Sequence, residues 1–208
     1  KLLVEGKDDL RVIPELIEKN GIVWVNNKKE PIVSIEDYGG YSNLNSDLIL
    51  TELQASGLTH LGLMVDADDD PQARWQSIRD ACSGSIADIP QEIPATGLIH
   101  TTNTGINFGV WMMPDNLMQG MLETFLAYMI PDESELLWTY AQEVVAEAKI
   151  KGAPFIDART DKAKIYTWLA WQKEPGRQLH DAIKYKILNP QHSKAQVFVN
   201  WFKTLYDL

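Results

Sequence analysis

Residues 60–71 read HLGLMVDADDDP, an almost continuous apolar run that stops abruptly at four acidic residues and a proline. An apolar run of this length, without alternation, is typical of a strand buried on both faces of a parallel sheet. Residues 72–81 follow at once and carry apolar residues at the spacing of a helix. The stretch therefore predicts a buried strand, an acidic loop at its carboxyl end and then a helix.

The same alternation of strand and helix extends on both sides of this stretch and stops beyond residue 117. We expect strands at 2–4, 31–35, 60–65, 96–101 and 108–113, and helices at 10–20, 44–55 and 72–81. The second half carries helical spacing alone, at 118–128, 133–149, 161–172, 177–184 and 193–205. The predicted fold class is therefore α/β, with a central, mostly parallel sheet flanked by helices and a mainly helical C-terminal extension.

The division of this chain into domains is only weakly marked in the sequence. No internal repeat, low-complexity tract or long Gly/Ser linker interrupts it. We expect an α/β domain over residues 1–130 and a helical extension over 131–208 that packs on it. One continuous domain is the alternative.

Composition narrows the class of protein and its compartment. Of 208 residues, 45% are hydrophobic and 23% are charged, which is the balance of a folded globular protein. No apolar run reaches the roughly 18 to 20 residues of a membrane span, so we expect no membrane association. The single cysteine, Cys82, cannot form an internal disulfide, and a reducing cytoplasm is therefore the expected location.

The net charge restricts the partners that this chain can bind unaided. Nineteen Lys and Arg against 29 Asp and Glu give a net charge of −10. Such a chain repels polyanions at long range, which argues against a free-standing nucleic-acid binder with a broad basic face. Contact with phosphate must then be local, or assisted by a metal ion or a partner.

Two acidic loops follow predicted strands. Glu5 comes directly after the strand at 2–4, and Asp66 and Asp68 come after the strand at 60–65. In a parallel α/β sheet, functional groups collect beyond the carboxyl ends of the strands. Mg²⁺ prefers oxygen ligands and needs only one or two carboxylates, with water and a substrate phosphate completing its shell. The pattern therefore predicts a site for Mg²⁺, or Mn²⁺, at Glu5, Asp66 and Asp68.

Neighbouring acidic residues have a simpler explanation. Asp8, Asp9, Asp69 and Asp70 precede predicted helices, whose N-termini favour negative charge, and we assign these four mainly to capping. A strand that ends in Asp-x-Asp is also found in metal-dependent glycosyltransferases and haloacid-dehalogenase phosphatases. By itself this motif is therefore not specific.

The two acidic loops together are more specific. LVEGKDD at residues 3–9, followed by a helix, and a strand ending in VDAD at 65–68 resemble the Toprim fold. That fold occurs in topoisomerases, primases, ribosomal-RNA maturation nucleases and OLD-type nucleases, and the resemblance covers residues 1–115. It implies that a glutamate and an Asp-x-Asp pair hold Mg²⁺ for phosphoester chemistry.

Carried over residue by residue, the resemblance makes Glu5, Asp66 and Asp68 the metal ligands and catalytic groups. Gly6 matches the glycine of the tight turn, where the chain approaches phosphate. Asp9 matches an acidic residue that OLD-type and maturation nucleases often place four after the glutamate, which makes it a further candidate ligand.

Three more residues are candidates for a second metal or for phosphate. OLD-type nucleases carry additional acids and a lysine, and Glu123, Lys7 and Lys162 could fill these roles. Outside the core pattern, the segments 109–116, 120–123 and 169–176 make the whole chain similar to a group of prokaryotic Toprim-like proteins. That similarity names a family and no activity.

The expected function is Mg²⁺-dependent cleavage of nucleic-acid phosphodiesters, as in a nuclease. DNA or RNA would reach the metal site with help from a separately encoded ATPase or DNA-binding protein, because OLD-type nucleases join their Toprim domain to an ATPase. One alternative is a non-catalytic interaction or regulatory module with the same fold. Another is phosphate transfer or hydrolysis on a small molecule.

The loop YGGYSN at residues 38–43 could cradle a phosphate, but it lacks the lysine and Ser/Thr of a P-loop. We expect a connecting turn there. Nothing in the sequence marks Tyr38 or Tyr41 as a nucleophile.

Overall fold

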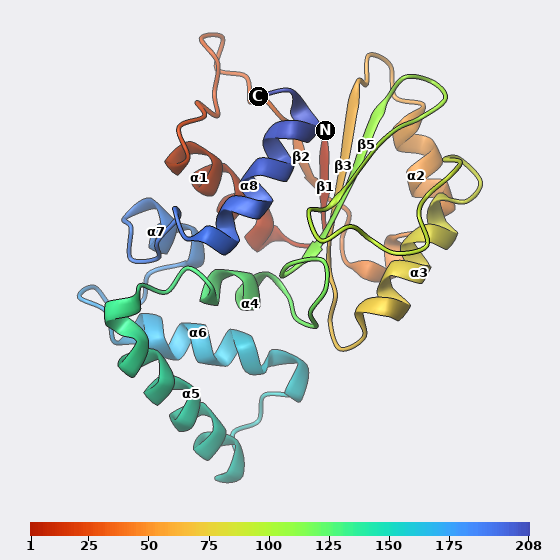
Figure 1. Cartoon of the computed structure of the whole chain (residues 1–208). Helices are drawn as coiled ribbons and strands as arrows, with labels where there is room; N and C mark the ends of the chain where they lie inside the picture. Colours follow the sequence, from red (N-terminus) through yellow and green to blue (C-terminus); the bar gives the residue numbers. More distant parts are fainter.

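The computed structural model describes residues 1–208 and contains one five-stranded sheet (Figure 1). The strands are β1 (Leu2–Val4), β2 (Ile35–Asp37), β3 (His60–Asp66), β4 (Leu98–Thr101) and β5 (Asn107–Met113). Their order is β2-β1-β3-β5-β4, and only the edge strand β4 runs antiparallel to its neighbour. The structure confirms the expected α/β class with a mostly parallel sheet.

Eight helices surround this sheet. They are α1 (Lys7–Lys19), α2 (Ser46–Leu53), α3 (Pro71–Cys82), α4 (Leu122–Ala127), α5 (Glu135–Ile150), α6 (Thr160–Ala170), α7 (Leu179–Lys184) and α8 (Ser193–Tyr206). Short 3-10 turns at Tyr41–Asn43, Asp132–Ser134 and Asp157–Arg159 precede α2, α5 and α6. None of the helices combines the length and the apolar character that a membrane span requires.

The expectation of a strand at 31–35 is wrong. Residues 24–32 form a small hairpin, with a bridge between Val25 and Pro31 and a hydrogen bond of 2.8 Å from the Ile32 nitrogen to the Trp24 carbonyl. The apolar residues there suggested a strand of the sheet, but Pro31 and Ile32 pair locally with Val25 and Trp24 instead. The sheet strand β2 begins only at Ile35.

The helix expected at 118–128 is shorter than its apolar spacing suggested. Gly120, at a φ of 139°, exchanges two backbone hydrogen bonds with Asp68, of 2.9 and 2.8 Å. These bonds hold the residues before Leu122 in an extended conformation. The helix α4 therefore begins at Leu122, against the end of β3.

Alternate residues of the central strands face two separate cores. On β3, Leu61, Leu63 and Val65 pack with α2 and α3, while Met64 faces the opposite side. The core on that opposite side contains 31 buried residues and combines β1 with the last helix, α8. Residues beyond 130 therefore help to cover one face of the sheet, as Figure 1 shows for α8, while α7 packs against α1.

Two glycines give α8 its place on the sheet. Gly62 and Gly109 are register partners on β3 and β5. A Cβ added at Gly109 would lie 2.6 Å from Cδ2 of Leu205, and one at Gly62 would collide with Tyr206. The absence of side chains at this pair allows α8 to approach the sheet closely.

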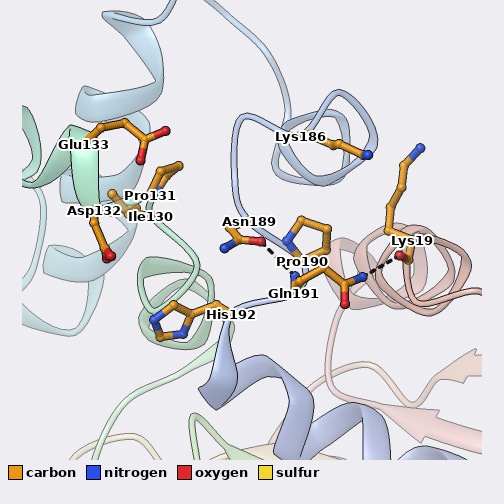
Figure 2. A pocket seen from close by; sticks show the side chains of 10 residues that line it. All are labelled: Lys19, Ile130, Pro131, Asp132, Glu133, Lys186, Asn189, Pro190, Gln191 and His192. Carbon is orange, nitrogen blue, oxygen red and sulfur yellow. Dashed lines mark hydrogen bonds between the residues drawn. The ribbon is translucent and has the colours of Figure 1, made fainter.

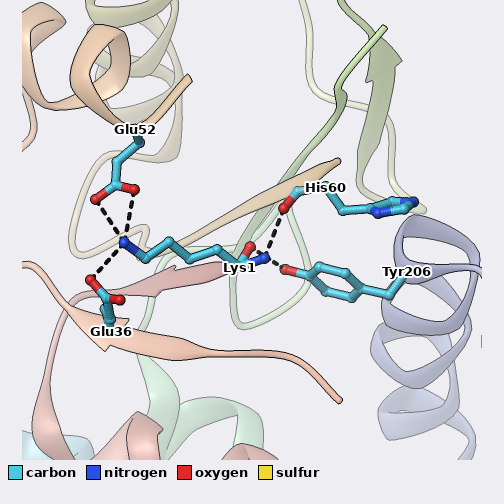
Figure 3. A network of polar contacts seen from close by, with 5 residues as sticks. All are labelled: Lys1, Glu36, Glu52, His60 and Tyr206. Carbon is cyan, nitrogen blue, oxygen red and sulfur yellow. Dashed lines mark hydrogen bonds and ion pairs between the residues drawn. The ribbon is translucent and has the colours of Figure 1, made fainter. Parts of the chain in front are cut away.

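The amino-terminal edge of the sheet is fastened by a polar network (Figure 3). Lys1 Nζ lies 2.7 Å from Glu36 and 2.9 Å from Glu52, which joins β2 and α2 to the first strand. The Tyr206 hydroxyl of α8 donates to the Lys1 carbonyl at 2.7 Å. The opposite, carboxyl edge of the strands faces α4 and α6 (Figure 1).

Candidate active site

The acidic residues predicted from the sequence meet at the carboxyl edge of the sheet. Glu5 follows β1, Asp66 ends β3, and these two strands are parallel neighbours. The backbone N–H of Asp66 donates to Glu5 Oε2 at 3.2 Å. The topology thus brings together two residues that are 61 positions apart in the chain.

Asp66 is also tied to the helix that follows β5. Its Oδ1 accepts a hydrogen bond of 3.0 Å from the backbone nitrogen of Leu122, the first residue of α4. Burial raises the pKa of the Asp66 carboxyl well above its ordinary value, and the charges of Asp9, Glu5 and Glu123 raise it further. This carboxyl is therefore surrounded by others of the same charge.

Asp68 makes different contacts from Asp66. Its φ of 52° places it in the left-handed region, where a residue other than glycine is uncommon, and its two backbone bonds to Gly120 hold it there. Its side chain is 46% exposed and forms an ion pair with Arg74. Strained backbone of this kind is concentrated at functional sites in proteins.

Asp9 lies behind these residues, at the start of α1. It is 7% exposed, and its Oδ2 accepts a hydrogen bond of 3.0 Å from the Gly6 nitrogen, which confirms its expected capping role. Burial raises the pKa of Asp9 to about 7, with contributions from the charges of Glu123, Glu5 and Asp8. Gly6 provides this backbone donor at the turn into the helix.

The other acids expected to cap helices divide into three cases. Asp70 is the N-cap of α3 and accepts from the Ala73 nitrogen at 3.0 Å. Asp8 lies in the first turn of α1 and also forms an ion pair with Lys162. Asp69 is exposed at the mouth of the site.

The helical second half contributes a cation to this acidic cluster. Lys162 of α6 lies 3.0 Å from Asp8 and 3.1 Å from the buried Glu123 of α4. Burial lowers the pKa of Lys162, but the charge of Glu123 and the hydrogen bonds to Asp8 and Glu123 outweigh this and leave it raised. The structure therefore places both Glu123 and Lys162 at the site, whereas Lys7 is exposed and makes no ion pair.

The carboxylates of the cluster oppose one another's ionisation. Burial raises the pKa of Glu5, the hydrogen bond from Asp66 partly offsets this, and the charge of Asp68 adds to it. With Asp9 and Asp66 also shifted upward, the folded protein holds protons in this cluster at pH values where ordinary carboxyls are ionised.

The donor set fits Mg²⁺ in its chemistry, because hard carboxylate oxygens gather where two strands end. In the present arrangement, however, no three Asp, Glu, His or Cys side chains converge as ligands of one ion. Each of the relevant acids has a partner of its own: the Asp66 nitrogen for Glu5, the Leu122 nitrogen for Asp66, and Arg74 for Asp68. A shared cation would require at least Asp68 to leave its partner.

Three residues that sequence reasoning missed complete the site. Arg74 is 8% exposed, and its guanidinium carbon lies 3.3 Å from the centroid of the Tyr41 ring. Tyr38 is close enough for the charges of Glu5, Asp66 and Arg74 to act on its hydroxyl, whose pKa is raised mainly by burial. One sequence signal marks Arg74: it shares the buried face of α3 with Ile78 and Ala81.

A groove of about 630 Å³ opens beside Asp68. It runs between the loop that precedes α4 and the start of α6, and Tyr128 and Thr124 form part of its wall. Its charged side chains are Asp68, Asp69, Asp157, Asp161 and Lys164. The groove beside Asp68 is therefore predominantly negative.

A second hollow, of about 410 Å³, lies away from these acids (Figure 2). It separates the end of α1 from residues 130–133 and 186–192. Gln191 Nε2 donates to the Lys19 carbonyl at 2.8 Å, and the Gln191 nitrogen bonds to Asn189 Oδ1 at 3.0 Å. The first bond joins the loop to the end of α1, and the second lies within the loop. The hollow is therefore a gap between packed elements.

A protein-family model described as "Protein of unknown function (DUF3226)" matches residues 1–207. The chain belongs to this family. The match spans the sheet and all eight helices, so the family is defined by the α/β part together with the helices that cover it. No curated protein and no solved structure matches the chain.

Proposed function

We propose that this protein is a Toprim-like, Mg²⁺-dependent phosphodiesterase that acts on nucleic acid. The observation that carries the proposal is the meeting of Glu5 and Asp66 at adjacent parallel strand ends, where the Asp66 nitrogen donates to Glu5 at 3.2 Å. The raised carboxyl pKa values of Glu5 and Asp66 support it, because perturbed ionisable groups are concentrated at catalytic sites.

In this proposal, Glu5, Asp66 and Asp68 hold Mg²⁺ or Mn²⁺, and Asp9 and Glu123 increase the negative potential behind them. The bound ion would polarise a phosphoryl oxygen and activate water as the nucleophile. Gly6 and Lys162 lie at the cluster as candidates for phosphate contacts, and Lys7 stands at its exposed margin. Because the carboxyls hold protons when the metal is absent, metal binding releases protons.

The negative groove and the net charge of −10 support a role for a partner. A protein that neutralises DNA or RNA phosphates over a long contact needs Lys and Arg there, and this groove has only Lys164. We propose that a separately encoded ATPase or DNA-binding protein brings the nucleic acid to the site. The proposal places both in the cytoplasm, where the buried Cys82 stays reduced.

One observation favours a second candidate, a non-catalytic module of the same fold. Arg74 pairs with Asp68, and Lys162 pairs with Asp8 and Glu123, so the chain itself neutralises part of the cluster. In a module that binds no metal, these ion pairs would be permanent. Metal binding therefore distinguishes the two candidates.

The test is titration of Mg²⁺ and Mn²⁺ into the wild type and an Asp66→Asn/Asp68→Asn double variant, followed by calorimetry. Asp69→Asn, at the exposed neighbouring acid, is the matched control. We expect saturable binding in the wild type and the control, and none in the double variant. Plasmid nicking and RNA cleavage on the same samples test the activity. Curves that do not respond to metal in any sample would reject the catalytic proposal in favour of the module.

A further inference from the structure

We propose that Arg74 and Tyr38 form a subsite for a phosphoryl group, and that a bound phosphate releases Asp68 from Arg74. This inference rests on the proposed function, because it assigns the phosphate of the substrate to a place beside the metal ligands. It makes the ion pair between Arg74 and Asp68 an exchangeable contact.

The guanidinium of Arg74 is held at a fixed place with one nitrogen unused. It lies between the Asp68 carboxylate and the ring of Tyr41. Its Nη2 donates to the Asp68 carboxylate. Nη1 is fully buried and has no hydrogen-bond partner, although the whole residue is only 8% exposed. A buried donor of a charged group without an acceptor is costly and uncommon, and a ligand that accepts from it would offset this cost.

A second buried donor without a partner lies in the same region. The hydroxyl of Tyr38 makes no hydrogen bond, and the charged groups that act on it include Glu5, Asp66 and Arg74. The loop that carries Tyr38 is anchored at the site, since the Gly40 nitrogen donates to the Glu5 carbonyl at 3.1 Å. An anion bound between these two elements would accept from both unused donors.

The chemistry of the subsite favours a phosphoryl group. A guanidinium presents parallel N–H donors that match two oxygens of a phosphate or carboxylate. The adjacent carboxylates repel a bare anion but accept one that shares a divalent cation with them. Phosphate meets both conditions, because its oxygens can bind Arg74 and the metal at the same time.

Occupancy of the subsite and of the metal site must then be coupled. A phosphate that takes the guanidinium frees the Asp68 carboxylate for the metal, and a metal that takes Asp68 frees the guanidinium. Each ligand therefore strengthens the binding of the other by the same factor, as thermodynamic linkage requires. Typical coupling of this kind is about 5- to 150-fold.

The test is calorimetric titration of Mg²⁺ with and without inorganic phosphate, after correction for their association in solution. In the wild type, we expect phosphate to tighten Mg²⁺ binding by about 5-fold or more. In Arg74→Gln, Mg²⁺ should bind more tightly than in the wild type without phosphate and should not respond to phosphate. Arg79→Gln, on the same helix, is the control and should behave as the wild type.

A second measurement needs no metal. Phosphate binding followed by ³¹P NMR should be tighter in Asp68→Asn than in the wild type, because the competing carboxylate is gone. It should be weak in Arg74→Gln and intermediate in Arg74→Lys, which keeps the charge but loses the planar fork. Phosphate affinity that is the same in Asp68→Asn, Arg74→Gln and wild type overturns the inference, because water then satisfies the two donors.

The outcomes separate this inference from the proposed function. If Mg²⁺ binds but phosphate has the same effect on the wild type and on Arg74→Gln, the subsite is rejected and the metal site stands. If no sample binds Mg²⁺, the catalytic proposal fails, and the NMR series alone decides whether Arg74 binds phosphate.

Discussion

The two ends of one sheet are built on opposite principles. At the amino edge, Lys1 Nζ lies between Glu36 and Glu52, and the Tyr206 hydroxyl has its acceptor (Figure 3). At the carboxyl edge, acids outnumber the cations Arg74 and Lys162 and hold protons, and two buried donors have no partner. These polar groups of the amino edge all have partners and stabilise the fold. At the carboxyl edge, crowded carboxyls and unpaired donors destabilise the free protein, and a ligand could relieve this cost.

The largest expected effect concerns Asp9. Its folded pKa of about 7 exceeds the ordinary 3.8, so the folded state holds a proton that the unfolded state has lost between these values. The free energy of unfolding therefore falls as pH rises from 4 to 7, by up to about 4 kcal/mol for a shift of about three units. We expect Asp9→Asn to remove this part of the slope and to be more stable than wild type at pH 8.

Urea denaturation at intervals from pH 4 to pH 8 measures this slope. Asn can still accept from the Gly6 nitrogen, so the cap is retained. Asp69→Asn, at the exposed acid, should leave the wild-type slope unchanged. Equal slopes in wild type and Asp9→Asn would show that Asp9 is ionised in the folded protein and would remove the main difference between the two edges.

The gain in protein stability from Mg²⁺ should depend on residues of the carboxyl edge and not on those of the amino edge. At a Mg²⁺ concentration of 100 times its Kd, we expect about 2.7 kcal/mol of added stability in the wild type and none in Asp66→Asn/Asp68→Asn. Glu52→Gln, at the amino edge, should lower the baseline stability and keep the full gain from Mg²⁺. At one fixed Mg²⁺ concentration, the gain should be larger at pH 8 than at pH 6, because metal displaces protons from the raised carboxyls and its Kd falls as they ionise. Thermal denaturation with and without Mg²⁺ tests the wild type and both variants, and a gain that survives in the double variant would place the ion elsewhere.

At the amino edge, Tyr206→Phe should cost about 1 to 2 kcal/mol. The change leaves the Lys1 carbonyl without the donor that now lies 2.7 Å away, in a largely buried position. We expect the loss to be independent of Mg²⁺ and phosphate. Urea denaturation measures it, and a neutral result would mean that water replaces the hydroxyl.

The smallest expected effect is a gain in stability, whereas Tyr206→Phe should cause a loss. Tyr38→Phe removes a buried hydroxyl that has no partner, so we expect the free protein to gain up to about 1 kcal/mol. The same change should weaken phosphate binding if the hydroxyl belongs to the subsite. Loss of stability in Tyr38→Phe would instead show that the hydroxyl is already hydrogen-bonded to water.

Local pattern was sufficient for most elements of the fold. The apolar run that ends at Asp66 predicted β3 and the acidic loop, and helical spacing predicted α5, α6 and α8 to within a few residues. It failed for residues 31–35, where apolar side chains serve a hairpin, and before α4, where Gly120 pairs with Asp68. Both failures arise because backbone pairing decides the conformation: with Val25, six residues before Pro31, in the first case, and with Asp68, 52 residues before Gly120, in the second.

The candidate site also contains some residues that the sequence predicts and some contacts that it does not. Strand ends identified Glu5, Asp66 and Asp68, because carboxyl ends of parallel strands share an edge whatever the order of the strands. No local pattern could pair Lys162 with Asp8, 154 positions away, or bring Tyr41 to Arg74. Their contacts depend on how α6 and the loop after β2 pack.

The sequence by itself thus determined the α/β class, the strands that carry the acids and the identity of the candidate ligands, since these follow from periodicity and from residue chemistry. Only the tertiary structure decided which acids are buried, which are paired with Arg74 or Lys162, and which donors are left unpaired. Burial and charge pairing depend on distances between segments remote in the chain, and these distances set the pKa values and the unsatisfied donors of the site.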